Sequence, residues 1–178
     1  MKIILTPVVF IFLIIACQNE SGTAADVAKN DTTIAYQMNE NKLSAVAANN
    51  TISNFQKATL QMVDAVFQSD SATLPLRVQD AIYELEVNIQ RVEEMPELNA
   101  LGDFKNAVVR LFKFYKIAFE KDFKILIPTI QNSNPSATDK AVLEAYDESF
   151  RAKEVELFKE ISLTQEAFAK ANNINLIN

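Results

Sequence analysis

The chain of 178 residues contains no histidine, no tryptophan, one cysteine and two glycines. Without histidine there is no histidine general base, no Ser-His-Asp or Cys-His dyad, and no imidazole metal ligand. A single cysteine excludes an internal disulfide, a Cys-x-x-Cys redox pair and a thiolate zinc site. Two glycines are too few for a glycine-rich phosphate or dinucleotide loop. We therefore expect no cofactor, no metal and no catalytic residue, and the sequence indicates a protein that is not an enzyme.

The first seventeen residues, MKIILTPVVFIFLIIAC, combine the basic Lys2 with an almost continuous apolar run that ends at Ala16. A run this short, followed by a small residue, is typical of a secretory signal peptide and not of a membrane-spanning helix. Its end, LIIAC, resembles a bacterial lipobox, in which the cysteine is acylated and becomes the mature N-terminus. We therefore predict a lipoprotein signal peptide over residues 1–16 and lipidation at Cys17.

The alternative is an ordinary signal peptide followed by an unpaired thiol, which is a liability in an oxidising compartment. Acyl chains contribute about 0.8 kcal/mol per buried methylene, so two or three of them hold a soluble domain on a bilayer. Gln18 follows the cysteine, where enteric bacteria use Asp to retain a lipoprotein in the inner membrane. We expect a lipid-anchored protein of the bacterial outer membrane, at its periplasmic face or at the cell surface.

The charge of the chain limits its partners. Removal of residues 1–16 takes away Lys2 and no acid, so the net charge changes from −6 to −7. An acidic chain is repelled by nucleic acid and by anionic lipid headgroups. We expect the membrane, through the anchor at Cys17, and another envelope protein as partners, and no nucleic acid. The oligomeric state stays open.

Beyond the cysteine, the chain divides into a short tether and a helical domain. Residues 17–30 are small and polar and predict a flexible, lipidated tether. Residues 31–178 contain four amphipathic helical patterns separated by short breaks, over 31–68, 74–95, 103–131 and 137–172. Four such helices predict an all-α, elongated, up-down-up-down four-helix bundle after the signal peptide and tether.

Local signals mark the ends of the last two helices. Asp103 is a suitable N-cap for the third helix. Pro128 lies late in the same pattern, so we expect that helix to kink or stop there. Ser136 or Thr138, ahead of Asp139, predicts a capped start of the fourth helix.

Charge is sorted among the helices. The third carries a net charge of +3, whereas the second and fourth each carry −3. This pattern favours the third helix as the neighbour of both. Its basic arc is open to two interpretations: a face for an acidic partner, or a solvated face beside acidic neighbouring helices.

One acidic residue and several aromatic residues form the candidate ligand or partner face. Asp122 falls within the apolar arc of the third helix, opposite Tyr146 in a hairpin centred near residue 134, so Tyr146 is placed to donate a hydrogen bond to it. Asp122 is then a polar lining of an internal pocket, a register-setting polar group, or a residue exposed near the Pro128 bend. Phe119 belongs to the apolar stripe, and Phe114 and Phe123 flank it. They fill the core or line a groove for an apolar ligand or partner helix.

Three short segments resemble a known family: 111–116 (LFKFYK), 119–120 (FE) and 165–170 (QEAFAK). They are similar to a family of small lipid-anchored bacterial surface proteins described from leptospires, whose function is unknown. The resemblance covers about residues 31–173 and implies a helical fold, a cell-envelope address and no catalytic residues. In that family the region of Pro128 continues as helix without proline.

These observations favour a non-catalytic binding or structural module of the cell envelope. The rival hypothesis is a carrier that sequesters an apolar ligand between its helices around Phe114, Phe119 and Asp122. A carrier needs an internal void of at least a few hundred Å³, whereas a core of ordinary packing density leaves the surface for binding. The interior therefore discriminates between the two hypotheses.

Overall fold

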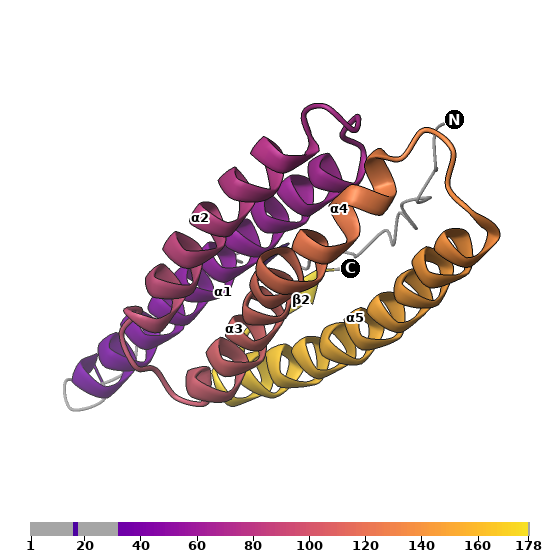
Figure 1. Ribbon diagram of the computed structural model, residues 1–178. Coiled ribbons are helices and arrows are strands. Elements are labelled where there is room, and N and C mark those ends of the chain that lie inside the picture. Colours follow the sequence, from indigo (N-terminus) through magenta and orange to yellow (C-terminus); the bar gives the residue numbers. More distant parts are fainter. Residues whose placement is uncertain (1–15, 18–31, 178) are drawn as a thin grey trace.

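The computed structural model describes the backbone of residues 16–17 and 32–177 and the side chains of residues 44–176. Within these ranges four long helical segments follow one another, and Figure 1 shows consecutive segments running in opposite directions. They are α1 (Thr32–Phe67), α2 (Leu74–Glu93), the continuous run of α3 (Leu101–Ile117), η1 (Ala118–Asp122) and α4 (Phe123–Gln131), and α5 (Ala137–Ala171). The predicted all-α class is confirmed, and each segment matches its predicted range to within two residues.

Two short strands join the described ends of the chain. β1 (Ala16–Cys17) pairs antiparallel with β2 (Leu176–Ile177), with Cys17 opposite Leu176. The hydropathy pattern gives no sign of this pair, because strands of two residues are too short to show alternation. The rest of the predicted signal peptide and tether lies outside the described residues.

The predicted helix ends are partly correct. Ser136 caps α5 as expected: its hydroxyl accepts from the N–H of Asp139, and the Asp139 carboxylate accepts from the N–H of Ser136. Asp103 is not the N-cap of α3. The helix begins two residues earlier, after Ala100 in the left-handed region (φ 57°). The earlier start places Leu101 in the core, where it is fully buried.

The expected stop at Pro128 does not occur, because α4 continues through it to Gln131. Proline removes one helical N–H, whose acceptor would be the carbonyl of Lys124. Lys124 lies on the exposed side of the helix, so water can satisfy that carbonyl. The irregularity of this run lies earlier, in the π-helical turn η1.

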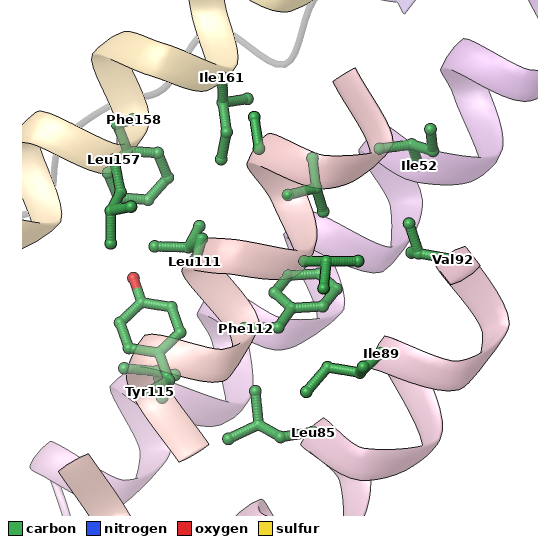
Figure 2. Close-up of a cluster of buried hydrophobic side chains, with 14 of the residues drawn as sticks. Ile52, Leu85, Ile89, Val92, Leu111, Phe112, Tyr115, Leu157, Phe158 and Ile161 are labelled. Atoms are coloured by element: carbon green, nitrogen blue, oxygen red, sulfur yellow. The ribbon is translucent and has the colours of Figure 1, made fainter. Parts of the chain in front are cut away.

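The run α3–η1–α4 is central to the packing. α3 packs against both α2 and α5, and α1 packs against α2, so the neighbours predicted from charge are confirmed. Figure 2 shows Phe112 between the two helices on the side of α3 nearer Ile89 of α2, and Leu111 directed toward Leu157 of α5. Leu85, Ile89, Leu111, Phe112 and Leu157 are all buried at this junction.

Four of the six basic residues of the predicted third helix are paired with acids on neighbouring elements. The pairs are Lys105–Glu97, Lys113–Glu93 and Lys116–Glu86 toward α2 and the loop after it, and Arg110–Glu160 toward α5. Arg110, Lys113 and Lys116 therefore lie at the surface beside acidic neighbours, as in the second of the two interpretations, whereas Lys105 is buried. Lys121 and Lys124 make no ion pair with a described residue.

Candidate functional site

The candidate face lies where the α3–α4 run changes from α-helical to π-helical geometry. In η1 the N–H of Phe123 bonds to the carbonyl of Ala118, five residues earlier, so this turn holds one residue more than an α-helical turn. The additional residue shifts the helical phase after η1 by about 100°. Phe123 therefore faces the core, at the position that regular spacing assigns to Asp122. Asp122 instead lies half-buried at the edge of the core.

Aromatic rings fill the space between the end of α1, the α3–η1–α4 run and the first half of α5. We call this cluster the aromatic seam; it consists of Phe67, Phe114, Tyr115, Phe119, Phe123, Tyr146 and Phe150. The ring centroid of Phe150 lies 4.8 Å from that of Phe114 and 5.4 Å from that of Phe67. Phe119 and Phe123 meet edge to face at 5.1 Å. Such pairs add to the stabilisation that burial of the rings provides.

The structure thus brings the four residues of the candidate face together. Phe119 and Phe123 are almost completely buried, Phe114 is partly buried against Phe150, and Asp122 is half-buried. Their aromatic side chains contact other rings of the protein, so these rings occupy the place at which the carrier hypothesis puts an apolar ligand.

The predicted hydrogen bond between Tyr146 and Asp122 is confirmed. The Tyr146 hydroxyl donates to a carboxylate oxygen of Asp122 at 3.2 Å and thereby joins α5 to η1. Burial, and then the negative charge of Asp122, hold the pKa of Tyr146 well above its ordinary value of 10.0. The phenol therefore stays protonated, and this contact fits the interpretation of Asp122 as a register-setting polar group.

A second phenol–carboxylate pair was not found from the sequence. The hydroxyl of Tyr115, which is fully buried, donates to Glu154 Oε1 at 2.6 Å. Burial raises the pKa of Tyr115 well above 10.0, and burial also raises the pKa of the Glu154 carboxyl. In the hairpin register that places Tyr146 opposite Asp122, Glu154 lies one residue from the position opposite Tyr115, so that register is the signal that points to this pair.

A hollow of ≈ 340 Å³ lies between α2 and α3 and is open to solvent. Ile89 and Ile117 form its apolar surface, and Gln90 also lines it. Two ion pairs cross it, Lys113–Glu93 at 2.8 Å and Lys116–Glu86 at 3.3 Å; all four of these charged residues line the hollow. This is a surface groove with a charged rim, on the opposite side of α3 from the aromatic seam.

Among the described residues, no helix is long and apolar enough to cross a bilayer. The same part of the chain holds no group of three or more cysteine, aspartate or glutamate residues placed to bind a metal ion. Every buried side-chain nitrogen or oxygen within residues 44–176 has a hydrogen-bond partner. Two of these bonds join helices: Asn88 of α2 donates to Thr59 of α1 at 3.3 Å, and Gln165 of α5 donates to Asn49 of α1 at 2.9 Å.

Comparison with models of protein families, with curated proteins and with solved structures found no match for this chain.

Proposed function

We propose that this protein is a bacterial cell-envelope lipoprotein, anchored to the outer membrane by acyl chains on Cys17. Its helical domain, a four-helix bundle in this proposal, acts by binding another envelope component or as a structural element, and performs no catalysis. The observation that carries the proposal is the sequence of residues 1–17, in which a short apolar run ends in Ala16-Cys17.

The position of the first helix is compatible with such an anchor. Cys17 pairs with Leu176, and β1 packs against α1, so acyl chains on Cys17 would hold the helical domain close to the bilayer surface. The polar composition of residues 18–30 suits a connecting segment outside the membrane.

The interior of the domain supports a binding or structural module in preference to a carrier. Rings of the aromatic seam contact one another between η1–α4 and α5, where a carrier would need an empty volume of several hundred Å³. The described hollow of comparable size is a groove on the outer surface between α2 and α3. Binding through outer helix faces is therefore the function that the packing supports best.

The anchor is tested by metabolic labelling of the producing bacterium with a fatty acid that carries a detectable group. The wild type and a Ser21→Ala control are expected to incorporate the label. Both are also expected to stay with the membrane fraction until detergent extracts them. Cys17→Ala is expected to incorporate none, because the acyl-accepting thiol is absent. Equal labelling of Cys17→Ala, or an unlabelled wild type, would show that the anchoring proposal is wrong.

The side of the membrane is tested by protease treatment of intact cells. Digestion of the wild-type domain in intact cells indicates the cell surface, whereas digestion only after the outer membrane is opened indicates the periplasmic face. Either result agrees with an outer-membrane lipoprotein. Recovery of the protein in the cytoplasmic fraction would contradict it.

A further inference from the structure

The β1–β2 strand pair places the proposed anchor on one side of the helical domain. Cys17 pairs with Leu176, and β1 packs against α1. β2 follows the C-terminal end of α5, where Ile174 is buried and its N–H donates to the carbonyl of Ala169. Leu176 packs against the hydrophobic core. Cys17 therefore lies beside α1 and is joined to the end of α5 through this strand pair.

α1 turns an uncharged side to solvent. Between residues 44 and 67 only Lys57 and Asp64 are charged, whereas α5 carries thirteen charged residues. Exposed positions recur along α1 every three or four residues and so follow one side of the helix. We call this side the α1 outer face; it consists of Ser44, Ala47, Thr51, Asn54, Ala58, Gln61 and Ala65. Contact with lipid headgroups requires no desolvation of charge at these seven residues.

The other helices carry charge on their outer sides. α2 and α5 are acidic, so anionic lipid headgroups repel both. The outer side of α3 carries Arg110, Lys113 and Lys116, each paired with an acid of α2 or α5. Contact of these pairs with a bilayer would remove their water, which is unfavourable. Among the described helices, α1 is therefore the one that approaches a lipid surface most easily, and it is also the helix beside Cys17.

From the position of Cys17 and the charge of the helices we propose that the α1 outer face and the β1–β2 pair rest on the headgroup surface of the bilayer. The α1 outer face is roughly 30 Å long, so α1 lies along the membrane surface and does not point away from it. The orientation rests on the proposed acylation of Cys17, which holds the strand pair at this surface.

This orientation directs the α2–α3 groove away from the lipid. Asn88 of α2 donates to Thr59 of α1, whereas Glu86, two residues earlier, lines the groove. Residues two apart point to different sides of a helix, so the groove lies on the side of α2 away from α1. Another envelope component therefore has access to the groove while the domain rests on the membrane.

Fluorescence quenching in vesicles tests the orientation. An acylated Cys17 has no free thiol, so a second cysteine is the one site at which a fluorescent maleimide attaches. Asn54→Cys places the label at the centre of the α1 outer face, and the matched control Asn106→Cys places it at an exposed asparagine of α3. Each full-length acylated protein is reconstituted into phosphatidylcholine vesicles, with and without a nitroxide quencher on the lipid headgroup.

The label at Asn54→Cys is expected to lose most of its fluorescence to the quencher, and so is a label at Gln61→Cys, two turns farther along the same face. The label at Asn106→Cys is expected to keep most of its fluorescence, because two packed helices separate it from the lipid by about 20 Å. Circular dichroism verifies that all three variants are folded.

Flotation with the vesicles separates failure of the anchor from failure of the orientation. A wild type that does not float shows that Cys17 does not anchor the protein, so the proposed function and the orientation are both wrong. A protein that floats, but is quenched equally at both positions or more strongly at Asn106→Cys, keeps the anchor and overturns the orientation alone.

Discussion

The two helix interfaces along α3, one with α2 and one with α5, are built differently; we call them the α2 seam and the α5 seam. Toward α2, apolar side chains such as Phe112 and Leu85 form the interior, and ion pairs lie at the solvent-exposed rim. Toward α5, aromatic rings form the interior, and two phenols donate to carboxylates within the seam. Exposed ion pairs contribute little to stability, whereas a carboxylate that loses its donor within a seam is costly. We infer that charge selects α2 and α5 as neighbours of α3, and that ring packing and the two phenols fix the position of α5.

The largest effect is expected from single-residue deletions within the α3–α4 run. Deletion of Asn106, in the regular part, rotates the apolar positions before it by about 100° relative to those after it. Deletion of Lys121 removes one residue from the π-helical turn and leaves an α-helical turn, which keeps Phe119 and Phe123 on the same side. We expect the first deletion to abolish cooperative thermal unfolding and the second to preserve it, as measured by circular dichroism. Equal damage from both would contradict our account of η1.

Truncation of a ring in the aromatic seam is expected to have the next largest effect. Phe150→Ala removes contacts with Phe67, Phe114, Tyr115 and Tyr146. We expect it to lower the free energy of unfolding by about 3–5 kcal/mol. Urea denaturation measures the change, with the exposed Leu163→Ala as control. A loss below about 1 kcal/mol would mean that the seam is loosely packed.

The two phenol–carboxylate pairs are expected to differ from each other. Tyr115→Phe leaves the Glu154 carboxylate without its donor in the more buried pair, and we expect a loss of about 1–3 kcal/mol. Tyr146→Phe affects the longer bond to the half-buried Asp122, and we expect a loss below about 1 kcal/mol. Urea midpoints of the two variants give this order directly. The reverse order would contradict the assignment of the tighter pair to Tyr115.

The α5 seam also gives stability a specific pH dependence. Burial raises the pKa of the Glu154 carboxyl above its ordinary value of 4.5, and repulsion by Asp147 adds to the rise, although the Tyr115 hydrogen bond and Arg151 oppose it. The folded state therefore binds more protons than the unfolded state between pH 4.5 and the raised value, so stability increases as the pH falls through this window.

We expect Glu154→Gln to reduce the increase in the urea midpoint between pH 7 and pH 5. Below about pH 4 the trend is expected to reverse, because hydrogen bonds from Ser136 lower the pKa of Asp139, and stability is lost as that carboxylate is protonated. Identical pH profiles for the wild type and Glu154→Gln would contradict the role of Glu154.

The smallest effect is expected at the rim of the α2 seam. Lys113 and Glu93 are each about half exposed, so their coupling in a double-mutant cycle with Lys113→Gln and Glu93→Gln is expected to be about 0.2–1 kcal/mol. In 1 M salt, where the Debye length is about 3 Å, the coupling should decrease further. A coupling above about 2 kcal/mol would remove the contrast between the two seams.

Much of this architecture follows from periodicity and charge. The 3.6-residue pattern predicts the helix ranges, and the sign of charge on each helix predicts the neighbours of α3. The hairpin register predicts the contact of Tyr146 with Asp122, and it also points to Glu154. These features depend on local spacing, which the sequence displays directly.

Other features depend on tertiary packing. Regular helical spacing does not reveal the π-helical turn, and it therefore places Asp122 in the apolar arc and Phe123 at its flank. Leu101 extends α3 beyond the expected cap because its burial outweighs the missing side-chain cap. The surface groove between α2 and α3 requires two helices to be placed before either side of it can be recognised.

Intact-mass measurement of the protein purified from its native membrane tests the central claim most directly. Our account predicts a chain that begins at Cys17 and carries the added mass of two or three acyl chains. A mature chain that starts at another residue, or an unmodified thiol at Cys17, would contradict it.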